Sequence, residues 1–258
     1  MKLRLYIILG FLLIVTIGSY LTLQNLTEED NSTLVIGTAS GYAPWVSMNA
    51  SGELEGFDID VINAIGLKLN KKIILKDLGS MSSLLIALNQ NKIYAIIWGM
   101  SITQDRLNNI AMVHYQGETD KSYPLIFWQK IPDNIKSIND MKGLTVSVEP
   151  ASTQDIVLSK YKNIIKIATE KVDDALLNIQ YGKTNAAFVE LPIAKKFKNK
   201  FPEIQILDIP LAQEDQVQGV GICIKLNNTK LINKIETAAQ ELKQDGTIKK
   251  LETKWNMS

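Results

Sequence analysis

Residues 94–106 read YAIIWGMSITQDR, and this stretch decides the class of fold. The apolar run Tyr94–Trp98 has the composition of a buried strand, and the polar loop after it contains Thr103, a preferred helix N-cap residue. The stretch therefore predicts a strand, a loop and a first helical turn that carries Arg106. From Thr33 onward, short apolar runs alternate with amphipathic runs, and this alternation predicts an α/β fold with mainly parallel sheets.

The predicted strands occur in two groups with the same order of elements. Residues 33–98 and residues 142–189 each read as β-α-β-α-β, although the two sequences are not similar. Two such units predict two doubly wound lobes, which we expect to be residues 33–118 with 219–258, and residues 119–218, joined by two hinge segments. The predicted strands are Leu34–Gly37, Ile73–Leu78, Tyr94–Trp98, Leu125–Trp128, Leu144–Val148, Ile164–Ala168, Ala186–Val189, Ile204–Leu207 and Val220–Ile224. From Leu231 onward the pattern is helical, with a break at Asp245-Gly246.

The N-terminus has the pattern of an export signal. Lys2 and Arg4 precede an apolar run over residues 5–23. That run is also long enough to span a bilayer. We therefore expect residues 1–26 to be either a cleaved signal peptide, the form we favour, or an uncleaved anchor in the inner membrane, with residues 27–32 as a linker. Both alternatives place the bulk of the chain in the periplasm.

Composition argues against several classes of function. Lys and Arg total 28 against 27 Asp and Glu, with no basic tract, so we expect no nucleic-acid partner. Cys223 and His114 are the single cysteine and the single histidine, which argues against an internal disulfide and a metal site built on these residue types. We also expect no cofactor. No serine or cysteine stands in a nucleophile motif.

Four strand-to-helix loops are candidates for a ligand site. In open parallel sheets, ligands bind at the carboxyl ends of the strands. Two of the loops belong to each predicted lobe, so a cleft between the lobes would bring all four together. The loops are Thr38–Trp45, Gly99–Arg106, Glu149–Asp155 and Glu190–Ile193.

Arg106 and Glu190 are the charged residues of most interest in these loops. A cation in a first helical turn is unfavourable by roughly 0.3–1 kcal/mol, and a bound anion would reverse that sign. Glu190 ends a predicted strand and could bind an ammonium group across the cleft. The alternative is that both are ordinary surface residues.

The remaining candidates also have simpler structural explanations. Ser152 and Asp155 have capping-box spacing, and most such pairs only cap a helix. Tyr42, Trp45 and Trp98 could wall a pocket or pack in the core. Asp58 is predicted to be the N-cap of the helix that begins in the GFDID motif.

Several segments in order resemble the family 3 bacterial solute-binding proteins. The similarity runs from about Thr33 to Trp255, and the order of the GFDID and GMSIT-x-x-R motifs is specific. It implies two α/β lobes of the periplasmic binding protein-like, type II fold, with an amino acid clamped between them. The segments are GFDIDVINAIGLKL, AIIWGMSITQDR, INDMKGLTVSVEPAST, AAFVELPIAK and ELKQDGTIKKLETKW.

The resemblance also implies roles for individual residues. Arg106 corresponds to the arginine that binds the ligand α-carboxylate, and Glu190 to the acid that binds the α-ammonium. The other implied contacts are Ser101 and the Gly99 backbone from one lobe, Thr153 and Ser152 from the other, and Tyr42 and Met81 around the ligand side chain.

This chain departs from the pattern of the family at four positions. Glu190 replaces a frequent aspartate, and Ala151 replaces the usual glycine of the turn. Trp98 replaces a small residue and should reshape the side-chain pocket. Ala39 stands where some members that bind basic amino acids have an aspartate, yet the segments around Arg106 and Glu190 resemble arginine-binding members. We therefore favour arginine, with another polar or basic amino acid as the alternative.

The resemblance predicts the substrate-binding component of an ABC importer. We expect a monomer that does no chemistry, binds a free amino acid and delivers it to the membrane permease subunits. One alternative is a periplasmic dehydratase-type enzyme on the same fold, with Glu190 or Glu149 as a general acid. Another is the ligand-sensing domain of a receptor.

Overall fold

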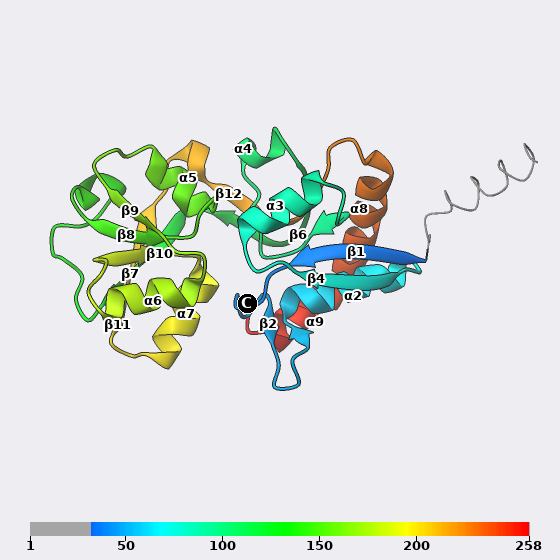
Figure 1. Cartoon of the computed structure of the whole chain (residues 1–258), viewed down its shortest axis with the longest axis horizontal. Coiled ribbons are helices and arrows are strands. Elements are labelled where there is room, and N and C mark those ends of the chain that lie inside the picture. The colour runs from blue at the N-terminus through cyan, green and yellow to red at the C-terminus, as the bar shows by residue number, and fades with distance from the viewer. Residues whose placement is uncertain (1–31, 258) are drawn as a thin grey trace, which may run out of the picture.

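The computed structural model describes residues 32–257, which form two lobes lying side by side (Figure 1). The first lobe has the sheet order β4-β1-β5-β12-β6, and the second lobe has the order β11-β7-β10-β8-β9. The predicted export or anchor segment, residues 1–26, lies outside the described residues. Within residues 32–257, no helix is both long and apolar enough to cross a membrane.

The first lobe is built from the two ends of the described chain. A short hairpin, β2–β3, follows β1 and leads into α2. The elements are β1 (Thr33–Thr38), β2 (Ser47–Met48), β3 (Leu54–Glu55), α2 (Phe57–Lys68), β4 (Lys72–Asp77), α3 (Met81–Asn89), β5 (Ala95–Ile96), α4 (Gln104–Leu107), β6 (Ala111–Asp120), β12 (Val217–Ile224), α8 (Thr229–Gln244) and α9 (Thr247–Lys254).

The second lobe is formed by the middle of the chain. Its apolar residues cover both faces of the sheet: residues of α6 and α7 pack with one cluster of buried side chains, and those of η1 and α5 with another. The elements are β7 (Ser122–Trp128), η1 (Ile138–Met141), β8 (Thr145–Val148), α5 (Thr153–Ser159), β9 (Ile165–Ala168), α6 (Val172–Gln180), β10 (Ala186–Phe188), α7 (Leu191–Lys200), β11 (Ile204–Pro210) and η2 (Gln213–Asp215).

The predicted β-α-β-α-β units are present in both lobes, but the expectation of mainly parallel sheets is wrong. In the first sheet β1 pairs in parallel with β4 and β5, whereas β12 is antiparallel to β5 and β6. The second sheet has the same mixture, with β7 antiparallel to β10 and β11. The reason is that the chain passes between the lobes twice, and each passage adds antiparallel strands to the parallel units.

Strand β6 was missed because it alternates instead of being continuously apolar. It lies at the edge of its sheet and, within residues 32–257, pairs only with β12. Val113 and Tyr115 are buried, while His114 between them is exposed. An edge strand with one solvated face has this period of two, which a search for apolar runs does not detect.

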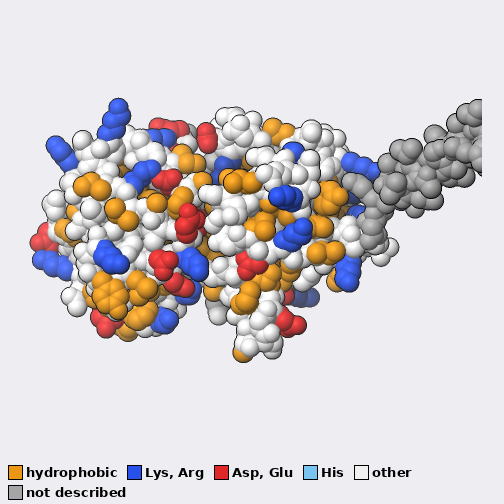
Figure 2. All heavy atoms as spheres, viewed as in Figure 1, with side chains coloured by type: hydrophobic (Ala, Val, Ile, Leu, Met, Phe, Trp, Pro, Cys, Tyr) orange, Lys and Arg blue, Asp and Glu red, His pale blue; other side chains and the backbone are white. Residues whose placement is uncertain are grey.

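Two short segments join the lobes. The chain passes from β6 to β7 through Lys121, and from β11 to β12 through residues 211–216. The predicted C-terminal helical segment is confirmed, with Gly246 at φ +77° between α8 and α9. The indole N–H of Trp255 donates to Asp60 Oδ2 at 2.7 Å and fastens α9 to α2. On the face shown in Figure 2, lysines and arginines are scattered over both lobes.

Candidate functional site

All nine residues singled out as ligand contacts line one cavity between the lobes. The cavity has a volume of about 10 Å³, roughly what one water molecule requires. Seven of its residues come from the first lobe and four from the second, so the lobes meet closely here. The lining is Tyr42, Met81, Trp98, Gly99, Met100, Ser101, Arg106, Glu149, Ser152, Thr153 and Glu190.

Arg106 is placed by a capped turn, as the sequence predicts. Thr103 is the N-cap of α4, and its hydroxyl accepts from Arg106 N–H at 3.2 Å. The guanidinium donates to Ser101 O at 2.9 Å and to Ala151 O at 3.0 Å. The second bond crosses from the first lobe to the second. Because α4 has only four residues, its dipole is small, and the two carbonyls orient the guanidinium.

Glu190 reaches back across the cleft from the second lobe. Its carboxylate accepts hydrogen bonds from Tyr42 Oη at 2.8 Å and from Ser101 Oγ at 3.1 Å. Burial raises the pKa of this carboxyl to about 7, although the bonds from Tyr42 and Ser101 and the charge of Arg106 lower it. Glu190 and Arg106 form no ion pair within 4.0 Å, so each retains capacity for a ligand charge.

Gly99 has to be glycine for two reasons. Its φ is +54°, and a Cβ would lie 2.9 Å from the ring of Trp45. Its N–H donates to Asp58 Oδ2 at 2.6 Å, so only its carbonyl is left to face a ligand. The prediction of Asp58 as an N-cap is wrong, because Gly56 holds that position. Asp58 is instead fully buried and also accepts from Tyr115 Oη at 2.6 Å.

The second-lobe loop presents hydroxyl groups to the cavity. Ser152 is the N-cap of α5, and its Oγ accepts from Asp155 N–H at 3.1 Å. The Asp155 carboxylate accepts from Ala151 N–H instead of closing a reciprocal capping box. Thr153 Oγ1 is buried and has no hydrogen-bond partner among residues 32–257. The Ser152 hydroxyl, whose oxygen accepts from Asp155 N–H, can still donate its own hydrogen to a ligand.

An aromatic pair forms one wall of the cavity. The rings of Tyr42 and Trp98 are 5.1 Å apart and tilted by 50°. Both side chains are almost completely buried, as is Met81 beside them. Trp45, by contrast, packs edge-on against Phe57 and lines a larger cavity of about 390 Å³ beside the hinge segments. Ser101 and Glu190 line both cavities.

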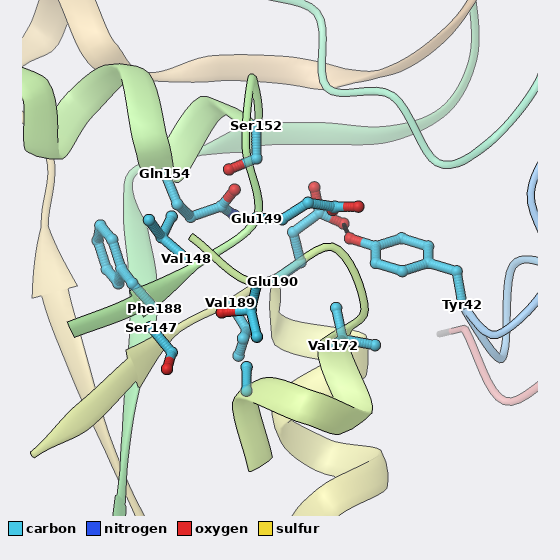
Figure 3. Close-up of a pocket in the computed structure, with 12 residues that line it drawn as sticks. Tyr42, Ser147, Val148, Glu149, Ser152, Gln154, Val172, Phe188, Val189 and Glu190 are labelled. Carbon is cyan, nitrogen blue, oxygen red and sulfur yellow. Dashed lines mark hydrogen bonds between the residues drawn. The ribbon is translucent and has the colours of Figure 1, made fainter. Parts of the chain in front are cut away.

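Sequence reasoning did not select two further residues as ligand contacts. Glu149 lines the cavity next to Glu190, and Figure 3 shows both side chains reaching toward Tyr42 from the second lobe. Burial and then the charge of Glu190 raise the pKa of Glu149 to about 8. Gln154 lines an adjoining small cavity, where its Nε2 is buried without a partner in the described structure. The feature of the sequence that could have indicated Glu149 and Gln154 is their position in the strand-to-helix loop Glu149–Asp155.

Comparison with known proteins places the site in context. The model for "Bacterial extracellular solute-binding proteins, family 3" matches residues 34–258. The probable ABC transporter arginine-binding protein ArtJ of Chlamydia trachomatis is 30% identical over 231 residues, which cover 90% of this chain and 88% of that protein. The histidine-binding periplasmic protein of Escherichia coli is 27% identical and covers 85% of this chain and 86% of its own.

A solved structure shows the same arrangement of both lobes. A mutant of ArgBP from T. maritima superimposes with a TM-score of 0.78 at 28% identity, and the match covers 89% of this chain and 97% of that one. The similarity therefore extends over nearly the whole described chain.

Proposed function

We propose, from the premise that this chain belongs to the bacterial extracellular solute-binding proteins of family 3, that its ligand is arginine. The protein is the substrate-binding component of an ABC transport system for amino acids. The observation that carries the choice of an amino acid is the pairing of Arg106 and Glu190. They come from opposite lobes, line one cavity and match the two charges of a zwitterion.

Ligand binding would exchange contacts within the protein for contacts with the ligand. The Arg106 guanidinium donates to the Ala151 carbonyl across the cleft, and Glu190 accepts from Tyr42 and Ser101. A cavity of about 10 Å³ is too small for an amino acid, so the lobes must separate to admit one. The α-carboxylate of the ligand then binds the Arg106 guanidinium, and its α-ammonium binds the Glu190 carboxylate. Both ligand groups are bound at the same time only when the lobes close.

The proposal of arginine rests on the wall around the side-chain end. Tyr42, Trp98 and Met81 offer flat or polarisable surfaces, on which a guanidinium can stack. Ala39 is buried and provides no acid. Relatives named for arginine and for histidine support a ligand of this class.

We further propose lobes of residues 33–118 with 219–258 and of residues 119–218, in which the paired ends of β6 and β12, residues 119–120 and 217–218, form part of the two hinge segments. The closed form of this two-lobed monomer would present its ligand to permease subunits outside the cytoplasm.

The test is a thermal-shift screen of the purified protein against the twenty amino acids. A ligand at 100 times its dissociation constant adds about 2.7 kcal/mol to the free energy of unfolding. We expect the largest shift with arginine, smaller shifts with histidine or lysine, and none with acidic amino acids. A largest shift with an acidic or an aliphatic amino acid would contradict the proposal.

A second candidate is an acid-catalysed dehydratase. The specific observation in its favour is that Glu149 and Glu190 both have raised pKa values, as a general acid requires. We expect binding without chemistry, because neither carboxyl is accompanied by an evident second catalytic group in the cavity lining. Incubation with prephenate and analysis of products by absorbance and mass spectrometry decides the question, and any turnover abolished by Glu149→Gln would establish an enzyme.

A further inference from the structure

The cleft contains one more carboxylate than the backbone of an amino acid requires. The cationic side chain in its lining is Arg106, and the carboxylates are Glu149 and Glu190. Arg106 and Glu190 match the α-carboxylate and α-ammonium that every amino acid has. Glu149 is left over, and its function has to be sought at the side-chain end of the ligand.

Glu149 differs from Glu190 in its contacts. The Glu190 carboxylate accepts two hydrogen bonds, from Tyr42 and Ser101. The Glu149 carboxylate accepts none from the part of the chain that the structure describes, and no lysine or arginine there forms an ion pair with it. A partly buried acid without a partner is unfavourable when ionised, and the nearby Glu190 makes it more so. A cationic ligand group would remove that cost.

The position of Glu149 suits such a group. It follows β8 directly and borders two adjoining small cavities, both of which are also lined by Tyr42, Ser152 and Glu190. Figure 3 shows its side chain extended toward Tyr42. A flat cation lying against the Tyr42–Trp98 pair would have its edge available to a carboxylate, which binds a guanidinium through two parallel hydrogen bonds.

We propose that Glu149 is the specificity-determining residue of this cleft and that its carboxylate binds the second cationic group of a basic amino acid, a guanidinium in preference to an ammonium. The inference rests on the proposed function, because Arg106 and Glu190 must first hold the backbone of the ligand. The charges agree with it, because a bound cation favours the ionised form of both glutamates, and two ionised glutamates with one arginine leave the cleft with one excess negative charge. Arginine has one excess positive charge.

The experiment compares L-arginine with L-citrulline, its neutral analogue of nearly the same shape, by calorimetry on the full chain. The wild-type protein should bind arginine more tightly than citrulline by about tenfold or more, since hydrogen bonds between charged groups are the stronger ones. Glu149→Gln should lower the affinity for arginine by about tenfold or more and change the affinity for citrulline by less than about threefold. Glu149→Asp keeps the charge on a shorter side chain and should retain part of the preference for arginine over citrulline. If Glu149→Gln does not fold, Glu149→Asp is tested in its place.

A matched control is Glu203→Gln. Glu203 is an exposed acid of the same lobe that lines neither small cavity and is not among the charges that shift the pKa of Glu149. This variant should keep the wild-type ratio of the two affinities.

The outcomes separate the two proposals. If the wild type prefers arginine and Glu149→Gln keeps that preference, the role of Glu149 is overturned while the proposed ligand stands. If the wild type binds a neutral amino acid and neither arginine nor another basic one, both are overturned. If Glu149→Gln lowers the affinities for arginine and citrulline equally, Glu149 supports the shape of the cleft and does not select the charge of the ligand.

Discussion

Arg106 is held in place by carbonyl oxygens and not by a protein carboxylate. Its two hydrogen bonds to Ser101 O and Ala151 O leave part of the five-donor guanidinium for a ligand. Because an ionised acceptor makes the stronger bond, a ligand α-carboxylate would displace the Ala151 carbonyl. We therefore expect Arg106 to contribute more to ligand binding than to the stability of the fold.

Arg106→Ala should lower ligand affinity by roughly thirtyfold or more, because loss of one partner leaves the ligand carboxylate buried and unpaired. Arg106→Lys should recover only part of the loss, since an ammonium cannot bind a carboxylate with a planar fork. Isothermal calorimetry measures both, and Lys142→Ala, an exposed cation of the second lobe, is the control. Wild-type affinity in Arg106→Ala would show that the arginine has no part in binding.

Ala151 adopts a backbone conformation that suits glycine. Its φ is +60°, and a Cβ in the left-handed region costs roughly 1–2 kcal/mol. Ala151→Gly should therefore raise the free energy of unfolding by up to about 1 kcal/mol, because the relief of strain exceeds the added entropy of the unfolded chain. Urea denaturation of the ligand-free protein measures this difference. A lower midpoint with an unchanged slope would show that the turn is not strained.

At the scale of elements, the buried strands, the loop positions and the edge strands β4, β9 and β11 were predictable, and the edge strand β6 and the contacts of the buried acid Asp58 were not. The central parallel strands β1 and β8 are mostly buried, because both faces of each sheet are covered there. Strand β6 escaped because only alternate residues such as Val113 and Tyr115 are buried. Asp58 fitted the N-cap rule, yet its partners Gly99 and Tyr115 are distant in sequence and became visible only with the fold.

The same limit applies to the candidate site. Strand ends indicated which loops converge, since the carboxyl ends of parallel strands share one edge of a sheet. Whether Glu149 points into the cleft or toward solvent depends on how closely the lobes approach one another, and local sequence does not determine that distance.

The N-cap of α5 offers a test at this scale of whether Ser152 acts on the helix, on the ligand or on both. Ser152→Ala should cost about 1 kcal/mol of stability, because its Oγ accepts from Asp155 N–H. Asn228→Ala is the matched control, since Asn228 caps α8 in the same way through Leu231 N–H, and it does not line the cavity. Both substitutions should lower the midpoint of chemical denaturation by similar amounts, but only Ser152→Ala should also lower the affinity for the ligand. Equal affinities in the two variants would limit Ser152 to capping.

At the scale of the whole molecule, folding places three acids in poorly solvated positions: Asp58 inside the first lobe, and Glu149 and Glu190 in the cavity between the lobes. Burial raises the pKa of Asp58 to about 7, of Glu190 to about 7 and of Glu149 to about 8. Their ordinary values are 3.8, 4.5 and 4.5. The folded protein therefore binds more protons than the unfolded chain between about pH 4 and pH 8. Within that window its stability should fall as the pH rises.

The melting temperature of the ligand-free protein should thus be lower at pH 8 than at pH 6.5. While a group is protonated only in the folded state, the free energy of unfolding falls by at most about 1.4 kcal/mol per pH unit. The contribution of each acid is complete below its ordinary pKa and is lost as the pH rises through its raised value. His114 acts with the opposite sign, because burial lowers its pKa, but its effect is confined to pH values below about its ordinary 6.5. Glu149→Gln should reduce the slope between pH 6.5 and 8, whereas Glu203→Gln, which removes an exposed acid that does not shift the pKa of Glu149, should leave it unchanged. Differential scanning calorimetry at several pH values measures the slope. A melting temperature that rises over this window would mean that Glu149 and Glu190 are solvated and that the lobes stand apart in solution.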